Sequence, residues 1–257
     1  MKREVDHFPE SKLPKITASF WIMKIAATTL GETGGDLVSM TLKVGYAVSS
    51  LILISSFALS LCGQLLSKRH HPPLYWLVIL TTSTAGTTMS DYMDRTLGLG
   101  YAKGSAILVA ALVGILALWR YTTGSLSVEH VKTRRAELFY WFAILISNTL
   151  GTALGDFLAD DSGFGFLGGA LLIGAMLAIV LALTLFTRFS RVLLFWLAFV
   201  LTRPFGATMG DVLTKSHEKG GLNLGTVGSS AVLAGVLALL VVRSVLKERT
   251  AHASAAD

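Results

Sequence analysis

The most constraining feature of this chain is a motif that occurs four times with fixed spacing. In each copy an aromatic residue and Trp are followed by Gly ten positions after the Trp, and by Asp five positions later. Each Asp lies within, or at the far end of, a stretch long enough to cross a bilayer, where a charged side chain costs about 2.5–3.5 kcal/mol to insert. Four such residues in register indicate a shared site. The copies are Phe20-Trp21…Gly31…Asp36, Tyr75-Trp76…Gly86…Asp91, Tyr140-Trp141…Gly151…Asp156 and Phe195-Trp196…Gly206…Asp211.

The composition places the chain among polytopic membrane proteins. Hydrophobic residues make up 53% of it and charged residues 15%, compared with about 25% charged in a soluble domain. The mean hydropathy is +0.63. The sequence pI is near 9.5, but the basic residues lie in short loops between apolar runs, which favours membrane topology over a nucleic-acid partner. The single cysteine, Cys62, excludes an internal disulfide.

The spacing of the apolar runs predicts an all-α protein with eight transmembrane helices, two from each repeat. Because each copy contributes two spans, all four copies have the same orientation. We expect one membrane domain whose repeats cover 16–67, 73–120, 137–188 and 192–246, with a cytoplasmic linker at 121–136 and a disordered C-terminal tail at 248–257. The helices are expected at 16–40, 46–66, 73–95, 101–119, 137–159, 165–187, 192–213 and 224–246.

The distribution of Lys and Arg predicts that both termini are cytoplasmic. Fifteen basic residues lie on the side of the termini and five on the opposite side, and the excess marks the cytoplasmic face. The aromatic-Trp pairs begin every odd-numbered span on that face, so we expect them to form an interfacial aromatic belt. The five basic residues of the opposite loops are Lys43, Arg95, Lys103, Lys215 and Lys219.

Polar residues precede each motif Asp at intervals of four, which places them on one helical face. The four stripes together hold five acids and two bases, a net charge of −3 if all are ionised. Because like charges in a low dielectric do not all ionise, we expect a bound cation, protonated carboxylates, or both. The stripes are Lys24/Thr28/Glu32/Asp36, Ser83/Thr87/Asp91, Asn148/Thr152/Asp156 and Arg203/Ala207/Asp211.

Small residues four positions apart accompany the motif in each odd-numbered span. Such pairs let helix backbones approach closely in lipid, where no hydrophobic force drives association. We therefore assign the motif glycines to helix packing. They are Gly31, Gly35, Gly86, Gly151, Gly155, Gly206 and Gly210.

The available ligand atoms favour a hard cation. All six histidines lie in predicted loops or tails, and the one cysteine is away from the motif. An all-oxygen site suits Mn²⁺ or Mg²⁺, Ca²⁺, Na⁺ or protons. We assign metal or proton binding to the motif aspartates and Glu32, with Arg203 as internal counter-charge beside Lys24. Asp94, Asp160 and Asp161 are interpreted as ordinary loop charges, and the substrate path is assigned to Thr28, Ser83, Thr87, Asn148, Thr152, Arg203 and Lys24.

The fourfold pattern of Gly, four residues and Asp over residues 20–245 resembles a family of bacterial integral-membrane proteins built from a tandem repeat of unknown function. The resemblance covers nearly the whole chain. It implies a multi-span helical fold in the bacterial inner membrane. It brings no substrate, and it assigns no site residues.

Three functions remain open at this point. The first is a secondary transporter for a divalent cation, Mn²⁺ or Mg²⁺, with protons as counter-ion and no covalent cofactor. The second is a proton-coupled carrier of a small organic solute, whose carboxylate Arg203 and Lys24 would hold. The third is a membrane scaffold or signalling protein whose aspartates only bridge helices. An enzyme is not expected, because no catalytic triad, phosphate loop or metalloprotease motif is present. The lipid bilayer is the expected environment, and a homodimer is a possible assembly.

Overall fold

The computed structural model describes residues 12–67 and 69–254 of the 257-residue chain. Within these residues the structure is helical and has no strand, with eight long helices joined by short turns. This confirms the predicted all-α fold. The long helices are α1 (Ala18–Asp36), α2 (Tyr46–Leu66), α3 (Pro72–Asp91), α4 (Tyr101–Thr123), α5 (Arg134–Asp156), α6 (Gly165–Phe186), α7 (Arg191–Thr214) and α8 (Thr226–Ser254).

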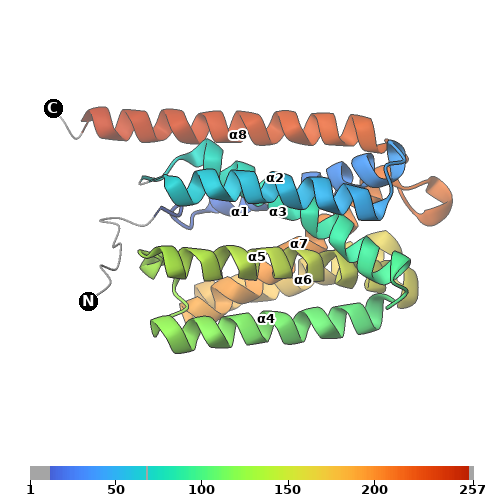
Figure 1. Ribbon diagram of the computed structural model, residues 1–257, viewed down its shortest axis with the longest axis horizontal. Coiled ribbons are helices and arrows are strands. Elements are labelled where there is room, and N and C mark those ends of the chain that lie inside the picture. The colour runs from blue at the N-terminus through green and yellow to red at the C-terminus, as the bar shows by residue number, and fades with distance from the viewer. Residues whose placement is uncertain (1–11, 68, 255–257) are drawn as a thin grey trace.

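The odd-numbered helices form a closed inner ring. Helix α1 packs against α3 and α7, and α5 packs against the same two neighbours. Each even-numbered helix lies outside this ring on the odd helix that follows it, so that α2 covers α3, α4 covers α5 and α6 covers α7. Helix α8 completes the cycle by packing on α1 (Figure 1). The four tandem repeats therefore fold into a ring of four similar units.

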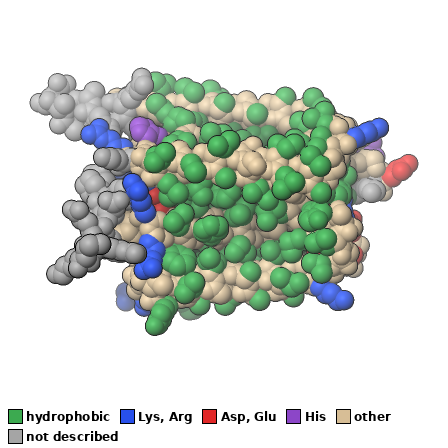
Figure 2. Space-filling view, viewed as in Figure 1, with side chains coloured by type: hydrophobic (Ala, Val, Ile, Leu, Met, Phe, Trp, Pro, Cys, Tyr) green, Lys and Arg blue, Asp and Glu red, His purple; other side chains and the backbone are tan. Residues whose placement is uncertain are grey.

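The surface is that of a multi-pass membrane protein. Six of the described helices are long and apolar enough to span a membrane, and α1 and α3 are not among them. Both are inner helices, and they carry polar residues that face other helices. Hydrophobic side chains cover the middle of the face shown in Figure 2, while Lys and Arg lie at its two ends. We call the end where α1 begins the aromatic end, and the opposite end the carboxylate end.

Local sequence signals set the ends of the helices. The Thr17 and Thr133 side chains accept hydrogen bonds from Phe20 N and Ala136 N, which caps α1 and α5. Helix α3 begins with Pro72, whose missing N–H costs nothing in a first turn. Gly45 precedes α2 with φ of +81°, a conformation in which a side chain would be strained.

The odd helices end differently in the fourth repeat. In the first three repeats α1, α3 and α5 end at the motif Asp and are followed by a π-helical turn: η1 (Leu37–Thr41), η2 (Tyr92–Thr96) and η4 (Phe157–Asp161). Helix α7 instead continues beyond Asp211 to Thr214, and the short helix η5 (His217–Lys219) follows. Helix α8 begins 15 residues after Asp211, whereas α4 begins 10 residues after Asp91. The fourth repeat thus has a longer loop at the carboxylate end.

The motif glycines lie where neighbouring inner helices touch. Gly31 packs against Ser83, Gly86 against Asn148, Gly151 against Arg203 and Gly206 against Thr28. A Cβ atom on Gly86 would lie 2.9 Å from the Asn148 carbonyl carbon, too close for a real side chain. The second small residue of the motif contacts the same neighbouring inner helix as the first. A Cβ on Gly35 would meet Thr87, one on Gly155 would meet Ala207 and one on Gly210 would meet Glu32.

The aromatic-Trp pairs do not form the lipid-facing belt that we expected. Trp76, Trp141 and Trp196 are buried, and their rings contact aromatic residues of the neighbouring helices. The Tyr75 and Tyr140 hydroxyls lie 2.6 Å apart. The reason is the packing of the ring, because α3, α5 and α7 are each covered by the outer helix of the preceding repeat, whereas Trp21 of α1 is half-buried.

Two segments between and after the repeats also differ from expectation. Helix α4 extends to Thr123, and the segment expected as a linker contains the short helix η3 (Val128–His130). Helix α8 continues to Ser254, so most of the tail expected to be disordered is helical, and residues 255–257 lie outside the described range. Three of the basic residues counted on the side of the termini, Lys2, Arg3 and Lys68, also lie outside the described residues.

Candidate functional site

All four inner helices meet in one buried hydrogen-bond network. Glu32 Oε2 of α1 is 3.0 Å from Arg203 Nη1 of α7 and accepts hydrogen bonds from Thr87 of α3 and Thr152 of α5. Arg203 Nη2 donates to the same two hydroxyls at 2.6 and 2.7 Å. Arg203 is fully buried and Glu32 is 3% exposed. In this network, which we call the axial network, the predicted counter-charge Arg203 contacts Glu32, the acid predicted in addition to the motif aspartates.

The motif aspartates form two clusters, each closed by a basic residue of the chain itself. We call the first the Lys215 cluster, and it consists of Lys215, Asp211, Asp36 and Glu32. Lys215 Nζ lies 3.1 Å from Asp211 Oδ1 and 2.8 Å from Asp36 Oδ2. Lys215 follows the end of α7. Burial alone would lower the pKa of Lys215, but the Asp211 and Asp36 carboxylates raise it above its ordinary value. Its ammonium is therefore charged at neutral pH.

The second, which we call the Arg95 cluster, consists of Arg95, Asp91, Asp156, Tyr46 and Tyr101. Arg95 Nε lies 3.0 Å from Asp91 Oδ1, and Nη2 lies 3.1 Å from Asp156 Oδ2. A third nitrogen donates to the Tyr46 hydroxyl at 3.2 Å, and the guanidinium lies over the Tyr46 and Tyr101 rings. Each nitrogen of the planar guanidinium thus has its own partner.

Both basic residues follow one rule of position. Arg95 is four residues after Asp91, and Lys215 is four residues after Asp211, so each bridges its own Asp and that of the next repeat. The other two repeats carry Met40 and Asp160 at the equivalent position. All four repeats therefore contribute an equivalent inner helix, but only the second and fourth carry a basic residue at this position.

One oxygen from each of Glu32, Asp36 and Asp211 lies within 4.8 Å of the others, and all three residues are buried. Carboxylate oxygens grouped in this way are ligands for hard cations. No histidine or cysteine belongs to this group. Lys215 already places a positive charge among them. In the Lys215 cluster, an ammonium group of the chain itself therefore lies among the grouped carboxylates.

The aromatic end of the axis is closed by bulky side chains. Lys24 is fully buried, and its Nζ lies 4.1 Å from the centre of the Phe199 ring. Lys12 Nζ and Glu137 Oε2 form a buried ion pair at 2.5 Å, which ties the segment before α1 to the start of α5. Lys24 is thus not brought to Glu32 or the motif aspartates.

The remaining neutral residues assigned to the path contact neighbouring inner helices. Thr28 donates to the Thr202 carbonyl across the α1–α7 contact, and Asn148 donates to Thr82 of α3 at 2.9 Å. The Ser83 side chain packs on Gly31, while its carbonyl accepts from Arg203. Thr87, Thr152 and Arg203 are the path residues that the structure brings to Glu32.

Sequence reasoning missed Arg95 and Lys215, which it placed in loops. Their signal was the spacing of four residues from a motif Asp, present in the second and fourth repeats only. With them the stripes hold five carboxylates and four basic residues, a formal charge of −1 in place of −3. Asp94, interpreted as a loop charge, is buried and accepts a hydrogen bond from Ser90.

Comparison with known proteins agrees with the repeat pattern. A family model described as a repeat of unknown function, DUF347, matches the chain four times in tandem, at residues 19–70, 74–125, 139–190 and 194–250. A search of the curated proteins and a search of the solved structures each gave no match.

Proposed function

This chain belongs to the DUF347 repeat family, and we propose that it is a secondary transporter for a hard divalent cation, Mn²⁺ or Mg²⁺, coupled to protons. The observation that carries the proposal is the Lys215 cluster. There two aspartates hold an ammonium group at 2.8 and 3.1 Å, with a third carboxylate beside them. The lysine occupies the position that the transported cation takes.

Exchange of Lys215 for the cation is the first step of the proposed mechanism. The Lys215 side chain is 20% exposed and lies just after the end of α7, next to the long loop of the fourth repeat. Its flexible stem allows the ammonium to move toward solvent. Asp36, Asp211 and Glu32 then offer oxygen ligands, and water completes the shell that Mg²⁺ and Mn²⁺ retain.

Glu32 connects the proposed cation site to the hydrogen-bond network that joins the four inner helices. The carboxylate that joins Asp36 and Asp211 also holds Arg203, Thr87 and Thr152. A divalent cation at the cluster competes with Arg203 for Glu32, which loosens the contact between α1 and α7. When the cation leaves, two positive charges are lost and Lys215 restores one, so that the remaining carboxylate charge in a low dielectric favours the binding of one proton. Proton movement opposite to the cation follows from this exchange.

The proposed setting is the bacterial inner membrane, with the aromatic end in the cytoplasm. The support is the excess of Lys and Arg in the loops at that end. The carboxylate end, which holds the Lys215 cluster, then faces the outside of the cell.

An organic-solute carrier is less well supported. It requires Arg203 to bind a substrate carboxylate, but both terminal nitrogens of Arg203 are engaged by Glu32, Thr87, Thr152 and the Ser83 carbonyl. Lys24 lies over Phe199, away from the acids.

Uptake into proteoliposomes tests the proposal. Mn²⁺ entry and internal pH are recorded for the wild type, for a variant with Asn at all four motif aspartates, and for Asp161→Asn. Asp161 is an exposed acid outside the motif, so it controls for a general change in surface charge. We expect saturable Mn²⁺ entry with opposite proton movement in the wild type and Asp161→Asn. Unchanged uptake in the folded four-Asn variant would refute the proposal.

A further inference from the structure

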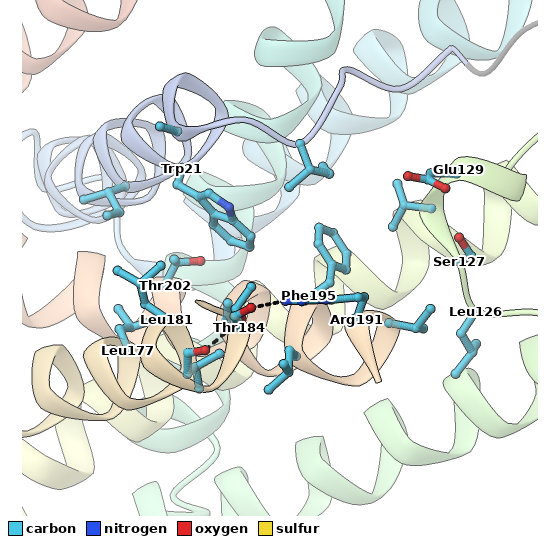
Figure 3. A pocket seen from close by; sticks show the side chains of 18 of the residues that line it. Trp21, Leu126, Ser127, Glu129, Leu177, Leu181, Thr184, Arg191, Phe195 and Thr202 are labelled. Atoms are coloured by element: carbon cyan, nitrogen blue, oxygen red, sulfur yellow. Dashed lines mark hydrogen bonds between the residues drawn. The ribbon is translucent and has the colours of Figure 1, made fainter. Parts of the chain in front are cut away.

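A cavity of about 630 Å³ lies at the aromatic end, where the first and last repeats meet. Its walls come from the start of α1, from α6 and α7, and from the segment between α4 and α5 (Figure 3). Trp21 and Phe195 contact each other across the α1–α7 seam, with ring centres 5.8 Å apart. This seam is the one position in the ring where adjacent repeats are not consecutive in the chain.

The cavity is apolar and lies among membrane-spanning helices. Leu177, Leu181 and Val180 of α6 form one side, and Ile25 of α1 with Thr202 of α7 form the floor. Both α6 and α7 are among the helices apolar enough to span a membrane. A bilayer, not water, is therefore the medium that adjoins these walls.

The rim of the cavity is basic. Arg191 at the start of α7 lines it, is exposed, and donates a hydrogen bond to the Thr184 carbonyl of α6. Two further exposed basic residues lie close to the lining in sequence, because Lys15 directly precedes Ile16 and Arg188 lies three residues before Arg191. Glu129 is the acidic residue among the lining residues. Arg191 and Glu129 are the charged residues of the lining, and Lys15 and Arg188 add two positive charges in the adjoining segments.

We propose that the cavity binds an anionic phospholipid, with an acyl chain in the apolar part and the phosphate at Arg191. The apolar walls suit an acyl chain, and the basic residues near Arg191 suit an anionic headgroup. Attraction between one Lys or Arg and an anionic lipid surface corresponds to about a fivefold change in affinity. The site is separate from the Lys215 cluster, which lies at the opposite end of the helices. The inference does not depend on the proposed transport function.

Stability measurements with defined lipids test this proposal. The detergent-purified protein is titrated with phosphatidylglycerol or with phosphatidylcholine of the same acyl chains, and the apparent melting temperature is recorded. A ligand that binds only the folded state raises this temperature by mass action. We expect a saturable rise that requires about fivefold less phosphatidylglycerol than phosphatidylcholine. Equal half-saturation for the two lipids would overturn the proposal, because it describes a lipid annulus without a headgroup site.

Three variants locate the site. Arg191→Gln removes the rim charge, and we expect it to abolish the preference for phosphatidylglycerol. Ala198→Trp fills the cavity that Ala198 lines, and we expect it to abolish the saturable rise with either lipid. Arg69→Gln removes an exposed arginine in the α2–α3 turn and should change nothing. A preference that survives in Arg191→Gln, or disappears equally in Arg69→Gln, contradicts the assignment whether or not Ala198→Trp folds.

Discussion

The two clusters at the carboxylate end are built on the same motif, but they hold their cations differently. Arg95 lies within the π-helical turn η2 and bonds to two carboxylates and the Tyr46 hydroxyl, with two rings beneath it. Lys215 lies in extended backbone after α7 and contacts two carboxylates with a single nitrogen. Among the described residues, three carboxylates come within 4.8 Å of one another in the Lys215 cluster, where Glu32 is the third acid. We infer that the Arg95 cluster is a fixed clamp and the Lys215 cluster an exchangeable site.

The largest expected effect is at Glu32, whose equivalents near the Arg95 cluster are neutral threonines. Glu32→Gln leaves the buried Arg203 without a counter-charge, which should lower the free energy of unfolding by about 3–5 kcal/mol. Thr152→Val, at the equivalent position in α5, removes two hydrogen bonds, one to Glu32 and one from Arg203, and should cost about 1–3 kcal/mol. Denaturation in mixed micelles of increasing SDS content measures both. If the two variants lose equal stability, the special role of Glu32 is wrong.

A second prediction concerns the contact that positions Glu32. A Cβ at Gly210 would lie 2.9 Å from Glu32 Cβ and 3.1 Å from its Cγ. Gly210→Ala should therefore destabilise the protein by about 1–3 kcal/mol and weaken Mn²⁺ binding. Gly34→Ala is the matched control, because its Cβ would meet only Thr84 Cγ2 at 3.6 Å. In a helix, that change should be neutral or stabilising by up to about 1 kcal/mol. Equal losses in the two variants would argue against this contact.

A third prediction compares the two clusters by removing the basic residue of each, Lys215 or Arg95. Lys215→Met removes the competitor for Asp36 and Asp211, so the affinity for Mn²⁺ should rise roughly tenfold, which corresponds to about 1.4 kcal/mol. Arg95→Met should lower stability without raising that affinity, because in the described part of the chain the group of three close carboxylates is Glu32, Asp36 and Asp211 and does not include Asp91 or Asp156. Calorimetric titration of the purified variants provides the values. A tighter Mn²⁺ site in Arg95→Met alone would reverse our assignment of the two clusters.

The smallest expected effect is at Tyr46. Tyr46→Phe removes one hydrogen bond to Arg95 and keeps the ring, so stability should fall by about 0.5–1.5 kcal/mol. Mn²⁺ affinity should stay unchanged, because Tyr46 belongs to the clamp. A change in affinity larger than the change in stability would show that the Arg95 cluster also takes part in cation binding.

The sequence predicted the helices and most of the axial acids, because their signals are periodic. The motif Asp and the residues four and eight positions before it define one face of each inner helix, and this face brought Glu32 and Arg203 together. The glycines predicted close helix contacts but not their order around the ring, since a single helix does not specify its neighbour.

Other features depended on contacts between repeats, which a repeat considered alone does not reveal. Trp76 and Trp141 were expected at the lipid interface, but the outer helices of other repeats enclose that layer. Arg95 and Lys215 were interpreted as loop charges because they follow the apolar stretch. Their role depends on contact with the Asp of the next repeat, and the packing of the inner helices sets the distance to that Asp.

The most direct test of the exchangeable site is Mn²⁺-dependent thermal stability in two double variants. One carries Asn at Asp36 and Asp211, and the other carries Asn at Asp91 and Asp156. Our account predicts that the saturable rise in melting temperature disappears in the first and persists, with the wild-type midpoint concentration, in the second. A rise that persists in the first variant, or disappears in both while both remain folded, would contradict the assignment of cation binding to the Lys215 cluster.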